Sequence, residues 1–256
     1  MTSGFKGART MVMGIVNVTP DSFSDGGKWS SAERALGRGR YLVDSGADLI
    51  DIGGESTRPG ASAVSSAEEL QRILPVVEGL VADGVVVSVD TLHASSASAV
   101  IEAGASFVND VSGGLFDPEM YAVVARAQKV RPLGYVLQHW RGVPSVMNSQ
   151  AEYGPDLVGE VLRELDLRLE AAAGAGVDLS QVIIDPGLGF AKVGDHDWQI
   201  LREIERFVSH EYAGYSFRVL VGASRKRSME VASAFRRSGV EGVGVGVGVG
   251  AGAGAG

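Results

Sequence analysis

Residues 85–110 read VVVSVDTLHASSASAVIEAGASFVND, a β-branched run, a segment of small residues and a second short apolar run. β-Branched runs of this length are typical of buried strands, whereas segment 94–103 has the composition of a helix. A strand, a helix and a strand in this order form the repeating unit of parallel sheets, because parallel strands need a long crossover between them. The stretch therefore predicts a parallel α/β fold.

The same alternation runs through most of the chain. Seven runs predict strands, namely MVMGIVNV, DLIDI, VVVSVD, SFVND, LGYVLQ, QVIID and FRVLVGAS. We expect helices near 32–43, 67–82, 94–103, 118–127, 155–173 and 198–208. Seven such units in 256 residues predict a TIM (β/α)8 barrel, with a doubly wound open sheet as the alternative.

A closed barrel needs an eighth strand, and the end of the chain does not supply an obvious one. Residues 242–256 read GVGVGVGVGAGAGAG. This alternation has the period of a strand, but one face would carry no side chains. We predict a barrel domain at 1–238, a low-complexity tail at 239–256, and a last β/α unit that is missing or replaced.

Composition narrows the function classes. The net charge of −8 disfavours nucleic acid and anionic membranes as partners. The absence of cysteine excludes disulfides, zinc–thiolate sites and a thiol nucleophile. The opening MTSGFKGART lacks the apolar region of a signal peptide. We expect a cytoplasmic protein that binds neither nucleic acid nor a membrane.

Each predicted strand ends in a polar residue. These are Asn17, Asp51, Asp90, Asn109, His139, Asp185 and Ser224. Any one of them has an ordinary reading as a turn former. In a barrel, however, the carboxyl ends of all strands gather on one face, where catalytic groups lie. Seven in succession favour a common site.

Four loops at these ends carry unusual chemistry, and they read NVTPDSFSDGG, GGESTRPGA, DPGLGFAK and GASRKR. Arginine, lysine and threonine suit a phosphate, and buried carboxylates accept hydrogen bonds from ring N–H groups. An asparagine beside phosphate oxygens suits Mg²⁺, which takes few protein ligands. The residues therefore predict a barrel that binds a flat polar ring inside and a phosphate near its rim.

Six motifs, in the same order, resemble those of dihydropteroate synthases, the folate-pathway enzymes that sulfonamides inhibit. They are GIVNVTPDSFSDGG, DIGGESTRPGA, SVDT, VNDVSGG, DPGLGFAK and GASRKR, and the resemblance covers about residues 11–228. It implies a (β/α)8 barrel and a transferase that joins 4-aminobenzoate to 6-hydroxymethyl-7,8-dihydropterin diphosphate. The implied products are 7,8-dihydropteroate and diphosphate.

The resemblance also implies roles for individual residues. Asn17 would ligate Mg²⁺ together with the diphosphate. Asp90 and Asp185 would act in catalysis by stabilising positive charge on the pterin, and Asn109 would help to hold the ring. Lys226, also catalytic, would reach both substrates. The remaining substrate contacts would fall on Phe23, Thr57, Arg58, Pro59, Phe190, Ser224 and Arg225.

The sequence departs from the family at its end. The family's final strand carries an Arg-x-His motif that binds diphosphate, but all four histidines here precede Lys226. We therefore expect weaker barrel closure, weaker diphosphate binding and a weaker form of the family's homodimer. Two alternatives stay open: a truncated or inactive pterin-binding protein, and a pterin-binding methyltransferase domain, which would not need the STRPG and SRK loops.

Overall fold

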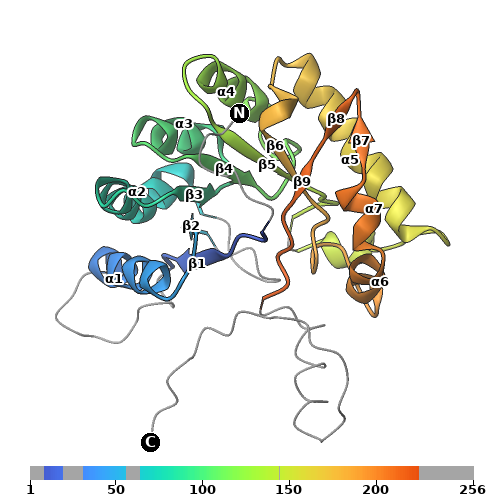
Figure 1. Ribbon diagram of the computed structural model, residues 1–256, viewed down its shortest axis with the longest axis horizontal. Helices are drawn as coiled ribbons and strands as arrows, with labels where there is room; N and C mark the ends of the chain where they lie inside the picture. Colours follow the sequence, from blue (N-terminus) through green and yellow to red (C-terminus); the bar gives the residue numbers. More distant parts are fainter. Residues whose placement is uncertain (1–8, 20–30, 56–63, 144, 225–256) are drawn as a thin grey trace, which may run out of the picture.

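The computed structural model describes residues 9–19, 31–55, 64–143 and 145–224. Their main feature is one parallel sheet of seven strands that follow each other in chain order (Figure 1). The strands are β1 Met13–Asn17, β2 Leu49–Gly53, β3 Val87–Asp90, β4 Phe107–Asp110, β5 Gly134–Gln138, β6 Val182–Asp185 and β9 Arg218–Val219. The predicted parallel arrangement is confirmed, although β9 is shorter than the run FRVLVGAS.

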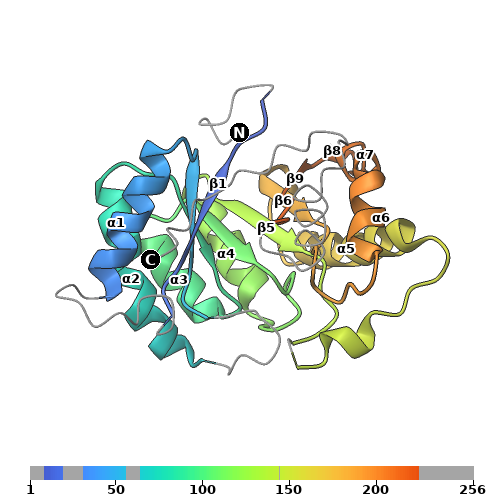
Figure 2. The same ribbon diagram turned by 90° about the horizontal axis from the view of Figure 1, so that it is seen from below.

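Helices connect the strands and cover the outside of the curled sheet (Figures 1 and 2). They are α1 Ser31–Asp44, α2 Ser66–Ala82, α3 Ala94–Glu102, α4 Met120–Gln128, α5 Leu157–Gly174, α6 His196–Arg202 and α7 Ile204–Val208, with short 3-10 turns η2 Met147–Gln150 and η3 Leu179–Gln181. All six predicted helices are present, the last one divided into α6 and α7. In the described part of the chain, β1 and β9 form the two edges of the sheet. The predicted missing unit falls after residue 224, outside the described residues.

A small hairpin was not predicted from the sequence. Strands β7 Glu211–Tyr212 and β8 Tyr215–Ser216 pair antiparallel just before β9. Their turn consists of Ala213 and Gly214, which both have positive φ angles, 51° and 81°. Two successive residues of this kind match the twist of a tight hairpin.

The core follows from helices that bury one stripe against the sheet. In α2 the fully buried residues recur at helical spacing, and they are Ile73, Val76, Val77 and Leu80. They pack with Ile50 and Ile52 of β2 in a cluster that spans β1–β3. A second cluster joins β4–β6 to α4, α5 and the α6–α7 segment. Helix packing of this kind fixes the strand ends, and with them the site.

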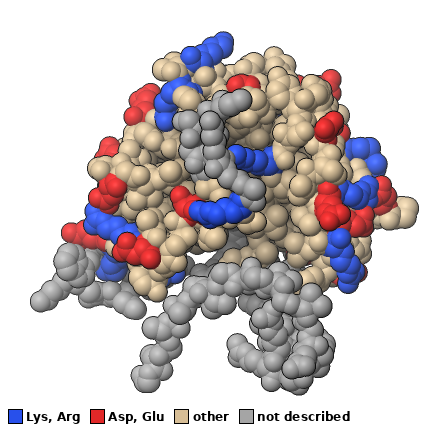
Figure 3. All heavy atoms as spheres, viewed as in Figure 1, with Lys and Arg blue, Asp and Glu red and all other residues tan. Residues whose placement is uncertain are grey.

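Many charged side chains cover the outer surface of the molecule. Figure 3 shows Lys and Arg interspersed with Asp and Glu around the helical rim, without one sign dominating this face. Within the described ranges, no helix combines the length and apolar character needed to cross a bilayer.

Candidate active site at the carboxyl ends of the strands

Asn17, Asp90 and Asn109 lie at one level on the sheet. The strand register pairs Asn17 with Gly53, Gly53 with Asp90, and Asp90 with Asn109. A Cβ placed on Gly53 would lie 3.4 Å from Asn17 Oδ1 and 3.5 Å from Asp90 Oδ2. The Asn17 and Asp90 side chains therefore flank the gap left by Gly53 on the same face of the sheet.

A buried carboxylate, Asp51, supports this row. Asp51 lies two residues before Gly53, so its side chain shares that face. It accepts hydrogen bonds from Ser88 Oγ at 2.6 Å and from Asn109 Nδ2 at 3.1 Å. Burial raises the pKa of Asp51, and the two hydrogen bonds oppose this shift. The sequence singled out Asp51 as a strand-end residue but gave it no role in the site.

The contact with Asp51 determines how the Asn109 amide faces. Its NH2 group is held by the carboxylate, which leaves Oδ1 buried with no hydrogen-bond partner. Buried carbonyl oxygens without a partner are rare in folded proteins, because each costs about 1–3 kcal/mol. Asn109 Oδ1 therefore offers a ready acceptor for an N–H donor on a ligand.

Asp185 enters the site from the other side, at the end of β6. It is 4% exposed, and its Oδ1 accepts a hydrogen bond from Gly187 N at 2.7 Å. Gly187 has a φ of +70°, and a Cβ there would lie 2.4 Å from His139 O, so only glycine fits. A Cβ on Gly222, beyond β9, would lie 4.0 Å from Asp185 Oδ2. The segment that leads to Ser224 thus passes close to Asp185.

Phe190 lies in a small apolar cluster above the strand ends. Its buried neighbours are Leu92, Val111, Met147 and Ala191, which come from the loops after four different strands. The structure therefore places Phe190 among the loops at the carboxyl ends of the strands, where its side chain is buried. Ser224, in contrast, is exposed where the described residues end.

Glu69 is a buried residue near the site that the sequence did not indicate. It comes from the first turn of α2, is fully buried, and accepts a hydrogen bond from Thr91 Oγ1 at 2.8 Å. Burial raises the pKa of Glu69, against hydrogen bonds that lower it. Together with Glu55 and Asp90 it borders a hollow of about 10 Å³, room for roughly one water.

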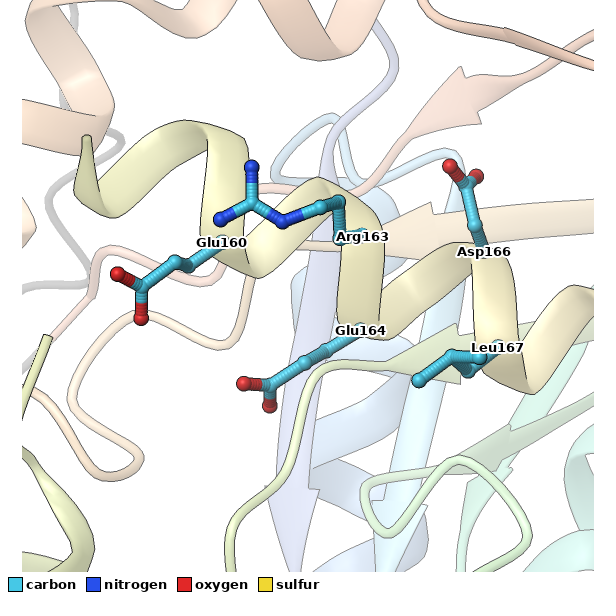
Figure 4. Close-up of a pocket in the computed structure, with 5 residues that line it drawn as sticks. All are labelled: Glu160, Arg163, Glu164, Asp166 and Leu167. Carbon is cyan, nitrogen blue, oxygen red and sulfur yellow. The ribbon is translucent and has the colours of Figure 1, made fainter. Parts of the chain in front are cut away.

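A larger hollow of about 440 Å³ lies elsewhere, along α5 (Figure 4). The side chains that line it come from one helix only, and they are Glu160, Arg163, Glu164, Asp166 and Leu167. Figure 4 shows them spread along the helix rather than converging on one point. No strand-end residue borders this hollow, so it is not the candidate site.

The described residues thus place Asn17, Asp90, Asn109 and Asp185 at the carboxyl ends of their strands, and Phe190 in a loop that follows. The other predicted residues, apart from Ser224, lie outside the described residues, and they are Phe23, Thr57, Arg58, Pro59, Arg225 and Lys226. Carboxylates and amides at strand ends, with one buried acceptor left free, are typical of barrels that bind a polar ligand.

Comparison with known proteins gives this class a family. The family model described as "Pterin binding enzyme" matches residues 13–254. The dihydropteroate synthase of Mycobacterium leprae (strain TN) is 44% identical over 220 residues, which are 86% of this chain and 74% of the relative.

Solved structures show the same family relationship. The dihydropteroate synthase of Xanthomonas albilineans with 4-aminobenzoic acid superposes with a TM-score of 0.78 at 43% identity, covering 89% of this chain and 77% of that one. The same enzyme in complex with 7,8-dihydropteroate gives a TM-score of 0.75 at 40% identity, with the same coverage. The chain belongs to the dihydropteroate synthase family of pterin-binding enzymes, which are transferases, and the TIM-barrel prediction is confirmed.

Proposed function

We propose that this chain joins 6-hydroxymethyl-7,8-dihydropterin diphosphate to 4-aminobenzoate, releasing diphosphate and forming 7,8-dihydropteroate. The observation that carries the proposal is the buried free Oδ1 of Asn109, which pairs in register with Asp90, on a sheet whose β6 ends in the buried Asp185. A pterin ring presents several N–H groups at its edge, and these three side chains supply acceptors for them. The family relationship supports the same reaction.

The chemistry proposed is a substitution at the pterin methylene carbon. The bond from this carbon to the diphosphate oxygen breaks, and the oxygen keeps the electron pair. The amino nitrogen of 4-aminobenzoate forms the new bond and then loses a proton to solvent. Positive charge develops on the pterin as the diphosphate leaves, and the carboxylates of Asp90 and Asp185 stabilise it. The weak basicity of an aromatic amine leaves its lone pair free at neutral pH.

We propose Mg²⁺ as the cation that accompanies the diphosphate. Asn17 fits this ion, because its Oδ1 lies at the strand ends beside the gap at Gly53. No group of three or more His, Cys, Asp or Glu residues in the described ranges is arranged to hold a metal. That suits Mg²⁺, which takes one or two protein ligands plus substrate oxygens and waters. When bound, it would neutralise charge on the departing diphosphate.

The remaining predicted residues keep the roles that the resemblance implies. We propose that Thr57 and Arg58 help to bind the second substrate, with Phe23, Pro59 and Phe190 around its ring. Ser224 and Arg225 would lie beside the incoming substrate or the diphosphate, and Lys226 would reach both substrates. The tail at 239–256, the weakened dimer and the cytoplasmic location stay predictions.

The proposal is tested by Asp90→Asn and Asp185→Asn. Each variant removes a charge that stabilises the transition state, so we expect a loss of about 100-fold in diphosphate release, equivalent to about 3 kcal/mol. Asp83→Asn is the matched control, since Asp83 pairs with Arg40 on the outer surface. Thermal unfolding of all three variants separates lost chemistry from lost structure. Near-normal turnover in both site variants would contradict the assignment.

A further inference from the structure

A buried cation lies next to the site, and the reaction above does not use it. Lys192, in the loop after β6, is 7% exposed. Its Nζ lies 3.0 Å from His139 Nδ1, 2.9 Å from Phe190 O and 3.3 Å from Gly187 O. A lysine ammonium has three N–H donors and no acceptor, so these three acceptors match its charged form.

His139 links Lys192 to α5 through a hydrogen bond at each of its ring nitrogens. Its Nε2 lies 3.0 Å from Glu164 Oε2, and a carboxylate only accepts hydrogen bonds, so Nε2 carries the proton. Nδ1 is then the acceptor that faces Lys192. Arg141 Nε donates to the same Oε2 at 3.1 Å, which keeps Glu164 in place. The donors and acceptors of these side chains thus fix which ring nitrogen of His139 faces Glu164 and which faces Lys192.

The loop that Lys192 holds has an unusual backbone. Gly187, Gly189 and Ala191 all have left-handed φ angles, +70°, +73° and +48°. For alanine this conformation costs about 1–2 kcal/mol. Side chains from outside the loop bind its polar groups: Tyr153 OH donates to Ala191 O at 3.0 Å, and Asp197 Oδ1 accepts from Gly189 N at 2.8 Å. Lys192 binds two further polar groups of the loop, the carbonyl oxygens of Gly187 and Phe190.

We propose that Lys192, aligned by His139 and Glu164, is a positioning residue that holds loop 186–191 in the shape required to bind the pterin. This rests on the proposed function. The two carbonyls that Lys192 grips belong to Gly187, whose N–H fixes Asp185, and to Phe190. Lys192 therefore positions Asp185, through Gly187, and Phe190.

The grip depends on the charge of Lys192. Burial lowers the pKa of Lys192 to about 7, while the carboxylates of Asp197 on α6 and Asp185 on β6 raise it. Arg141 acts against the charged form and Glu164 acts for it, and the neighbouring His139 is neutral at this pH. A neutral amine has only two N–H donors for the three acceptors. The loop is thus held best below about pH 7 and loosens above it.

The test begins with Lys192→Met, which keeps the length of the side chain and removes its donors. We expect a KM for pterin diphosphate raised about tenfold or more, with a smaller change in kcat. In the parent enzyme this KM should rise between pH 6 and 8, and Lys192→Met should abolish the rise. A normal KM, or an unchanged pH profile, overturns the proposal.

Two variants of His139 test the alignment without removing the lysine. An asparagine amide reaches the position of Nδ1, so His139→Asn keeps an acceptor for Lys192. A glutamine amide reaches the position of Nε2, so His139→Gln keeps the contact with Glu164 instead. We expect a near-normal KM in the first variant and a raised KM in the second. Equal KM values in the two folded variants overturn the proposal even where Lys192→Met does not fold.

Failure of this inference is distinguishable from failure of the proposed function. If Asp185→Asn abolishes diphosphate release while Lys192→Met and His139→Gln bind pterin diphosphate normally, only the positioning role is wrong. If Asp185→Asn has no effect, the assigned reaction itself is wrong. Calorimetry with pterin diphosphate and Mg²⁺ on the full chain gives the binding values directly.

Discussion

The orientation of Asn109 can be tested by replacing Asp51 with leucine. This change keeps the branched outline of the side chain but removes the carboxylate that accepts from Ser88 Oγ and Asn109 Nδ2 among the described residues. Two buried donors then lack partners, each at a cost of about 1–3 kcal/mol. Relief from burying a carboxylate offsets part of this cost, as the raised pKa of Asp51 indicates. We expect a net loss near the lower end of about 2–6 kcal/mol.

Binding should suffer as well, since nothing then holds the Asn109 amide in one orientation. We expect Asp51→Leu to bind pterin diphosphate about tenfold more weakly. Asp51→Asn is the matched control. Its amide oxygen accepts from Asn109 Nδ2, and its NH2 donates to Ser88 Oγ, because a hydroxyl also accepts. This control should stay within about 1 kcal/mol of the parent and bind nearly normally.

The assays are urea unfolding for stability and calorimetry for pterin diphosphate binding, both on the full chain. The reasoning is refuted if the asparagine variant loses as much binding as the leucine variant, because the carboxylate charge would then matter more than the hydrogen-bond geometry. It is equally refuted if the leucine variant binds like the parent. A change in binding without any change in stability would show that Ser88 finds another partner.

Two further predictions concern stability. A Cβ on Gly134 would lie 2.1 Å from Phe107 Cδ1, so Gly134→Ala should lower the free energy of unfolding in urea by about 1–3 kcal/mol. Gly37 lies in a helix, and a Cβ there would meet no atom within 4 Å, so Gly37→Ala should raise the free energy of unfolding by about 0.5–1 kcal/mol. Equal effects of the two substitutions would contradict this packing. Burial lowers the pKa of His139 to about 4, below 6.5. Burial opposes ionisation of Glu164, but hydrogen bonds from His139 and Arg141 lower its pKa to about 2, below 4.5. The unfolded chain therefore binds more protons, so stability falls as pH drops from about 6.5 to 2, and Glu164→Gln should flatten this fall below about pH 4.5; an unchanged slope would contradict it.

The sequence predicts the row Asn17, Asp90, Asn109 and Asp185 because two local signals combine. A buried parallel strand is a short apolar run, and a polar residue at its end can only face the cleft where such ends gather. Helix positions follow equally well, since an amphipathic stripe is a local property.

Other parts of the site depend on partners far along the chain. Glu69 appears in the sequence as an ordinary acid in the first turn of a helix, but in the fold it is buried and accepts a hydrogen bond from Thr91, which follows β3. Lys192 lies two residues after an aromatic residue in a glycine-rich loop, and nothing nearby indicates that His139 will accept a hydrogen bond from it. The hairpin at 211–216 was missed because its strands are two residues long. Such contacts arise only once the fold brings the segments together.

The strand order of the sheet has a consequence for how the protein is made. Each strand from β2 to β6 pairs with the strand that precedes it in the chain, so every new pairing joins the last segment to leave the ribosome. Pairing with the preceding strand closes only the loop that contains the intervening helix, which carries a modest entropic cost. The sheet can therefore add one strand at a time during synthesis. Asn17, Asp90 and Asn109 would then be in register before the segment that follows β9 has been translated. This part of the site would therefore form early, while synthesis continues.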